Sequence, residues 1–202
     1  MTIIERGVEY EDEDAEFFPD GAVRDATLAH DATIQGLPCA AGRSVVFYES
    51  GRLKLVWLSR PAVLDGIPCP AGQIVFLHEN GGLMNSELGA AHDFAGLVLP
   101  AGTRVTLDEI GQLLEYSQSL SADQRMDGVP CASLFNVWRY PSAKLSTAVL
   151  AAAVEIDGQE YQRGTELWLG EDGRVIRSQV LNVDFSKKYK HAVCGVYEMP
   201  WE

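Results

Sequence analysis

The chain has 202 residues, of which 47% are hydrophobic, and its formal net charge is −13. The apolar fraction suffices for a packed core and excludes general disorder. The negative charge disfavours nucleic-acid binding and adsorption to anionic membranes, because both depend on clustered Lys and Arg.

The first segment, residues 1–14, is strongly acidic. Residues 1–20 contain eight Asp and Glu against a single arginine. We predict a solvated terminus, with a docking strip for a basic partner as the alternative. The segment lacks the pattern of a secretory signal, and no apolar run reaches the roughly 18–20 residues of a membrane helix. These features predict a cytoplasmic protein without membrane association.

Residues 15–181 form a repeat with a period of about 30 residues. "GLPCAAGRSVVFYESGRL" from Gly36 matches "GIPCPAGQIVFLHENGGL" from Gly66. Further copies begin at Gly96, Gly128 and Gly158. An incomplete copy, from about Ala15 to Val23, precedes the copy at Gly36. Self-similarity at a fixed period indicates a repeat architecture of about six units, the first truncated and the fifth degraded.

Each copy contains two apolar columns separated by one residue. The columns are Val45, Val75, Val105, Val137 and Leu167, and then Phe47, Leu77, Leu107, Arg139 and Leu169. This spacing predicts a strand with one buried face, and the "ESG", "ENG" and "EDG" segments that follow predict tight turns into a second strand. Further Gly-containing turns before each "GhPC" element raise the expectation to two or three short strands per unit.

We therefore predict an all-β fold: about six 30-residue β-hairpin repeats in an elongated antiparallel meander over residues 15–181. A β-solenoid or β-roll and a closed barrel are the alternatives. Residues 182–202 are predicted to be a C-terminal cap. The alanine-rich stretch "AKLSTAVLAAAVEI" aligns with strand positions of the other copies, so we expect strands there too.

The cysteines and histidines predict no metal or cofactor site. Cys39, Cys69 and Cys131 share a column with Leu99 and Tyr161. Because metal and redox chemistry needs a thiolate, a column that accepts leucine indicates packing. The column of His78 is variable and is interpreted as exposed.

The chain lacks a local catalytic signature. It contains no GxSxG, P-loop or GxGxxG motif in the required context. We therefore expect no enzyme; an enzyme whose residues assemble across repeats without a local motif is the least favoured alternative.

One column differs from the pattern of a one-sided sheet. Lying between the two buried positions, it should point to the opposite face, yet it contains large apolar residues. The column consists of Glu16, Val46, Phe76, Thr106, Trp138 and Trp168. The candidate residues are its apolar members Val46, Phe76, Trp138 and Trp168, with Trp57, Tyr48 and Tyr140 nearby and Arg139 as a local departure from the repeat. We predict that these eight residues bind a partner, because Trp and Tyr are favoured interface anchors. An ordinary two-sided core is the alternative.

The segments "LHENGGLMNSEL" and "LGEDGRVIRSQV" resemble the hairpin units of bacterial MORN-type repeat proteins. The 30-residue period and the "GhPCxAG" element depart from the usual shorter unit. The resemblance implies a protein-interaction or scaffold module, and some such proteins resemble antitoxin or immunity partners, whose acidity suits a basic toxin. Our first functional hypothesis is thus non-catalytic binding of a protein partner, and the second is a self-assembling structural protein.

Overall fold

The computed structural model describes residues 2–5, 7–11 and 15–181, which form 24 β-strands and no helix. The chain divides into two compact units, residues 1–114 (unit 1) and 115–202 (unit 2), and each is treated separately below. The predicted all-β antiparallel meander is confirmed in both. None of the described residues forms a helix that is long and apolar enough to cross a membrane.

Unit 1 combines a meandering sheet with a series of short two-stranded hairpins. The short hairpins are β1 (Thr2–Glu5) with β2 (Val8–Glu11), β5 (Ala32–Ile34) with β6 (Leu37–Cys39), β9 (Ala62–Leu64) with β10 (Ile67–Cys69), and β13 (His92–Phe94) with β14 (Leu97–Leu99). The sheet contains, in chain order, β3 (Glu16–Phe17), β4 (Val23–Thr27), β7 (Ser44–Phe47), β8 (Leu53–Trp57), β11 (Ile74–Leu77), β12 (Leu83–Glu87) and β15 (Arg104–Leu107).

Unit 2 repeats the same pattern. Its short hairpins are β17 (Gln124–Met126) with β18 (Val129–Cys131) and β21 (Val154–Ile156) with β22 (Gln159–Tyr161). Its sheet contains, in chain order, β16 (Leu113–Gln118, which begins at the end of unit 1), β19 (Val137–Arg139), β20 (Leu145–Val149), β23 (Thr165–Leu169) and β24 (Val175–Val180). The alanine-rich stretch lies in β20 and β21, so the prediction of strands there is confirmed.

The short hairpins turn through two residues with positive φ. Leu64 pairs with Ile67, and the residues between them, Asp65 and Gly66, have φ of 51° and 81°. This is the geometry of a type I′ turn, which Asp-Gly adopts readily. The other short hairpins from β5 onward repeat the pattern, with the first turn residue at Gln35, Ala95, Asp127 or Asp157.

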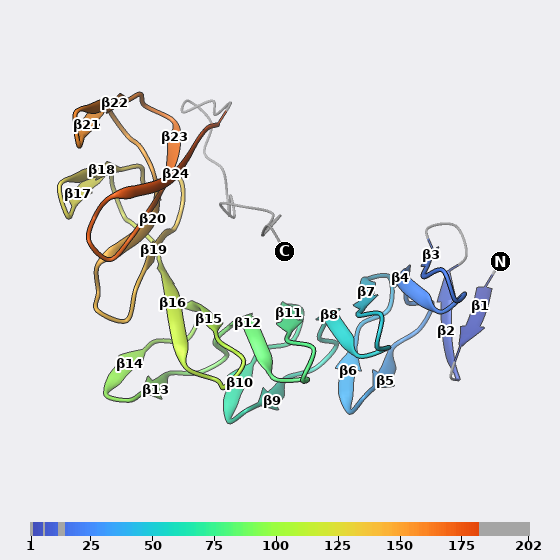
Figure 1. The fold of residues 1–202 in the computed structure, drawn as a ribbon. Helices are drawn as coiled ribbons and strands as arrows, with labels where there is room; N and C mark the ends of the chain where they lie inside the picture. The colour runs from blue at the N-terminus through green and yellow to red at the C-terminus, as the bar shows by residue number, and fades with distance from the viewer. Residues whose placement is uncertain (1, 6, 12–14, 182–202) are drawn as a thin grey trace. The chain divides into compact units, whose positions relative to one another are not determined.

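The core lies between one face of each sheet and the short hairpins. In unit 1, β5–β6, β9–β10 and β13–β14 lie along the same side of the sheet strands (Figure 1). Cys39 of β6 bridges to Leu58, and both side chains are fully buried. The predicted inward columns are buried here, since Val45, Val75 and Leu77 are at most 3% exposed.

The first copy of the repeat, which the sequence predicts to be truncated, also contains a short hairpin. Hairpin β1–β2, within the acidic segment 1–14, is the short hairpin of this copy. Tyr10 bridges to Leu28 as Cys39 bridges to Leu58, and Tyr10 is 3% exposed. The sequence signal was lost because an aromatic residue replaces cysteine and the following segment lacks the "AG" element.

The solenoid and barrel alternatives do not describe these sheets. Consecutive sheet strands pair antiparallel, and the terminal strands β3 and β24 each have one paired neighbour among the described residues. The sheets are therefore open. The predicted cap, residues 182–202, lies outside the described residues.

Candidate binding face of the sheet

The outward face of the unit 1 sheet contains a continuous cross-strand row. Val46 lies opposite Leu55, which lies opposite Phe76. The row continues to Asp25 at one end and to Asn85 at the other. Directly opposed side chains on one face are in contact distance, so the three apolar residues form one surface across β7, β8 and β11.

A second pair of residues widens this surface. Trp57 lies opposite Ile74 on the same face of β8 and β11. The Arg43 guanidinium carbon lies 4.7 Å from the centroid of the Trp57 ring, a cation–π arrangement. We call Val46, Leu55, Trp57, Ile74 and Phe76 the outer patch; each is half-buried.

Polar pairs flank the outer patch on both sides. On one side, the Ser44 hydroxyl donates a 2.5 Å hydrogen bond to Asp25. On the other, the Asn85 amide donates a 2.9 Å hydrogen bond to the Thr106 hydroxyl. An apolar centre with a polar margin is the usual composition of a protein interface.

In unit 2 the equivalent row contains both predicted tryptophans. Trp138 and Trp168 lie on either side of Thr147, and Arg177 lies beyond Trp168. Trp138 is only 3% exposed, so it presents almost no surface. Trp168 is half-buried, and the Arg177 guanidinium carbon lies 4.7 Å from its ring centroid.

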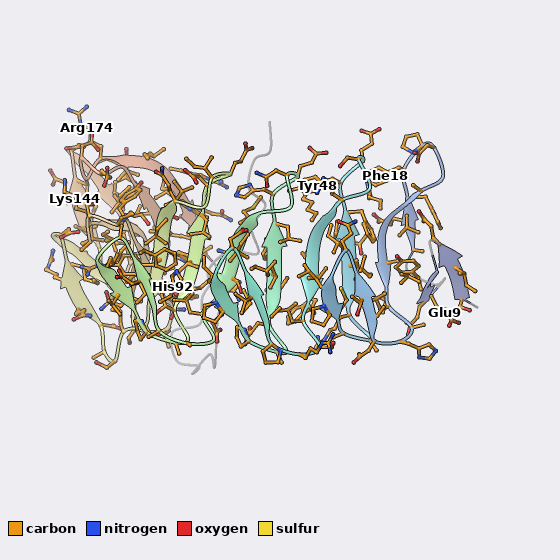
Figure 2. All side chains as sticks on the ribbon, turned by 90° about the horizontal axis from the view of Figure 1, so that it is seen from below. Glu9, Phe18, Tyr48, His92, Lys144 and Arg174 are labelled. Atoms are coloured by element: carbon orange, nitrogen blue, oxygen red, sulfur yellow. The ribbon has the colours of Figure 1, made fainter. Side chains whose placement is uncertain are left out.

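Tyr48 and Tyr140 have a structural role that the sequence did not indicate. The Tyr48 hydroxyl donates to the Leu77 carbonyl at 2.8 Å, and the Tyr140 hydroxyl donates to the Leu169 carbonyl at 2.7 Å. Figure 2 shows Tyr48 and Phe18, its counterpart in the first copy, along the same margin of unit 1. Burial raises the pKa of both tyrosines above the ordinary value. Each hydroxyl therefore links its repeat to the next one.

The interpretation of the His78 column, which also contains Tyr48 and Tyr140, as exposed is wrong. His78 is half-buried, and its Nε2 lies 3.0 Å from the Leu107 carbonyl. This is the same link that the two tyrosines make. The alignment of His78 with two tyrosines could have indicated this shared role. Both side chains have a ring with a polar atom at a similar distance from the backbone.

Arg139 is half-buried within an otherwise apolar column. It lies opposite Tyr116 on β16 and Leu145 on β20. Its Nε is buried and has no hydrogen-bond partner among the described residues. Nearby, burial raises the pKa of Glu115. The local departure from the repeat is thus a partly buried polar position inside unit 2.

The cysteine column is a packing column, as predicted. Cys39, Cys69 and Cys131 are at most 1% exposed and are free thiols. Burial raises the pKa of Cys39 and of Cys131 to about 11, so both are protonated at neutral pH. In the part of the chain that the structure describes, no three His, Cys, Asp or Glu side chains are grouped to hold a metal ion.

Sequence reasoning found three members of the outer patch and missed Leu55 and Ile74. Their position on the outward face can be recognised only from the strand register. Simple alternation would place Leu55 on the buried face with Leu53, and only the bulge in β8 brings it opposite Val46 on the outward face. A scan against protein-family models finds no matching family, and a search of curated proteins finds no match.

Proposed function

We propose that this protein is a non-catalytic binding module whose outer patch in unit 1 docks a protein partner. The observation that carries the proposal is the half-buried apolar row Val46–Leu55–Phe76 on the sheet face opposite the core. A contiguous apolar surface with a polar rim is typical of protein-interaction sites.

The form of the patch favours a protein over a small ligand. Small molecules are held in concave sites that bury most of their surface, whereas the outer patch lies on a pleated sheet face. Its aromatic members, Trp57 and Phe76, supply large contact areas of the kind that dominate protein interfaces. The likeness to MORN-type repeats, with its expectation of an interaction or scaffold module, belongs to the same proposal.

Charge favours a basic partner. The net charge of −13 attracts a cationic protein and accelerates the encounter at low ionic strength. Arg43, above Trp57, is an exception at the patch itself, where its positive charge favours an acidic residue of the partner at that point. A basic toxin-like protein neutralised by an acidic binding protein is one relationship of this type.

The test is a binding measurement on a purified partner. Proteins cross-linked to the wild-type chain are identified, and each candidate is produced and titrated against wild type and Phe76→Arg. We expect Phe76→Arg to weaken binding by at least about tenfold, because it introduces a charge into the contact.

A matched control uses another exposed apolar residue of unit 1. Val98 on the short strand β14 is 64% exposed and lies outside the outer patch, so Val98→Arg should leave the affinity unchanged. Equal affinities for wild type and Phe76→Arg, with both chains folded by circular dichroism, would exclude the outer patch as the binding face.

A further inference from the structure

The last sheet strand of unit 2 has an open edge. β24 occupies the same repeat position as β4, β8 and β20, each of which lies between two strands. Among the described residues, β24 pairs with β23 alone. Ile176 and Val180 on this strand are 71% and 76% exposed. A six-residue exposed edge is a template for pairing with another strand.

Val180 belongs to a column that the following copy normally covers. The earlier members of the column, Leu28, Leu58, Leu88, Leu120 and Leu150, are at most 8% exposed. In four of these junctions a glycine amide of the next copy donates to the carbonyl of this residue, at 2.7–2.9 Å for Leu28, Leu58, Leu88 and Leu150. The end of β24 therefore presents one half of a repeat junction.

Strand β3 of unit 1 presents the other half. It corresponds to β7, β11, β15, β19 and β23, the strands that receive the preceding copy, and it pairs with β4 alone among the described residues. Phe17 is 47% exposed, whereas Phe47, Leu77 and Leu107 in its column are at most 9% exposed.

The register of the internal junctions predicts which residues of the two edges would meet. Across the junctions, Asp25 lies opposite Val46, and Thr147 lies opposite Trp168. Continuing this register places Arg177 of β24 opposite Glu16 of β3. Opposite charges directly across two strands favour pairing.

The charges near the two edges are complementary as well. Residues 173–181 contain Arg174 and Arg177 and no acid, whereas residues 1–20 contain eight acids. Glu16 already pairs with Arg24, but both side chains are more than half exposed, so this pair adds little stability and leaves the carboxylate accessible.

We propose that β24 of one copy pairs antiparallel with β3 of a second copy, continuing the repeat from chain to chain. The contact joins two different surfaces, so it is heterologous, and it produces open head-to-tail chains unless the rotation between copies closes a ring. The proposal does not depend on the outer patch, and it concerns a second copy of this chain as the partner. The net charge of −13 opposes association, and salt near 0.15 M screens that repulsion beyond about 8 Å.

Sedimentation velocity of the full chain across a concentration series tests the proposal. We expect species larger than a dimer that grow with concentration. Arg177→Glu and Glu16→Lys should each reduce the association at least about fivefold, which corresponds to one lost charge-assisted contact. The chain that carries both substitutions restores an opposite-charge pair and should recover most of the association.

Two further variants keep the result interpretable. Arg174→Glu makes the same charge change in the turn before β24, outside the proposed register, and should associate like wild type. Ser178→Pro removes a backbone amide on the open edge of β24. In the equivalent strand β20, the Leu150 amide donates to the Thr165 carbonyl of the next sheet strand. Val180 takes the place of Leu150 in β24, and the amides of Val180 and Ser178, two residues apart, point to the same edge. This variant should stay folded and fail to form chains.

Three results would overturn the proposal. The first is a monomer at every concentration, as expected if residues 182–202 cover β24 within the chain. The second is a closed dimer that does not grow with concentration. The third is an equal loss of association in Arg177→Glu and Arg174→Glu.

Discussion

Strands β8 in unit 1 and β20 in unit 2 occupy the same place in the repeat, yet their environments differ. In β8, Leu53 and Val56 are buried while the residues around them are half-buried. All five residues of β20 are buried. The same strand position therefore has one covered face in β8 and two in β20. In unit 1, four of the five residues of β12 are also buried, so the difference lies between individual strands and not between the units.

The sizes of the neighbouring side chains explain the difference. β20 contributes the small residues Ser146, Thr147 and Ala148, and Trp138 and Trp168 flank Thr147 on the outward face. In unit 1 the corresponding central residue is Leu55, between Val46 and Phe76. The repeat sets the backbone, and the exposure of a column depends on its cross-strand neighbours. Of the two interpretations of the aromatic column, the two-sided core describes Trp138, which is 3% exposed, whereas Val46, Phe76 and Trp168 keep part of their surface exposed.

The largest expected effect comes from the leucine column that both units share. Leu58 in unit 1 and Leu150 in unit 2 are fully buried, so replacing either with alanine should cost about 2–5 kcal/mol. Val180→Ala, in the same column but 76% exposed, should cost less than about 0.5 kcal/mol. Urea unfolding of the three variants measures this, and a cost for Val180→Ala equal to that for Leu150→Ala would show that β24 is covered in solution.

Replacing Arg139 in unit 2 should instead increase the free energy of unfolding. Arg139→Leu returns the aliphatic residue found at Leu77, Leu107 and Leu169, and it removes a buried Nε that lacks a partner. We expect stabilisation of about 1–3 kcal/mol, since an apolar residue avoids the desolvation cost of a partly buried cation. Thermal and urea unfolding measure the change, and a loss of stability would indicate that Arg139 is held by interactions beyond packing.

The sheet strands could be predicted from the sequence better than the short hairpins. The strands from residue 15 onward repeat in sequence, so their columns identified the inward face, and Val45, Val75 and Val105 are buried. The short hairpins were only partly anticipated, because three-residue strands such as Ala62–Leu64 are too short for a clear alternation.

The candidate site was harder to predict because exposure is a property of the sheet and not of one strand. The sequence placed Val46 and Phe76 in one column but could not show that Leu55 lies between them. It also could not separate Val46 from Trp138, which share the column and differ in burial.

A smaller effect distinguishes the turns of the short hairpins. The Asp65 carboxylate accepts a 2.7 Å hydrogen bond from the Leu83 amide, and Asp127 does the same for the Leu145 amide in unit 2. Asp65→Ala and Asp127→Ala should each lose about 1–2 kcal/mol, because a backbone donor is left without its acceptor. Asp65→Asn, which keeps an acceptor oxygen and tolerates positive φ, should stay close to wild type in the same urea titration. Equal losses for the alanine and asparagine variants would contradict the hydrogen-bond explanation.

The smallest expected effect concerns the hydroxyl links between successive repeats. Tyr48→Phe in unit 1 and Tyr140→Phe in unit 2 each remove one hydrogen bond to a carbonyl and keep the ring, so each should cost about 0.5–1.5 kcal/mol. The first copy naturally has Phe18 at this position, which shows that the repeat folds without the hydroxyl. Hydrogen exchange should place the loss of protection at the two repeats joined by the missing bond. A loss spread evenly over the chain would instead mean that the repeats unfold as one cooperative block and that no single link limits local opening.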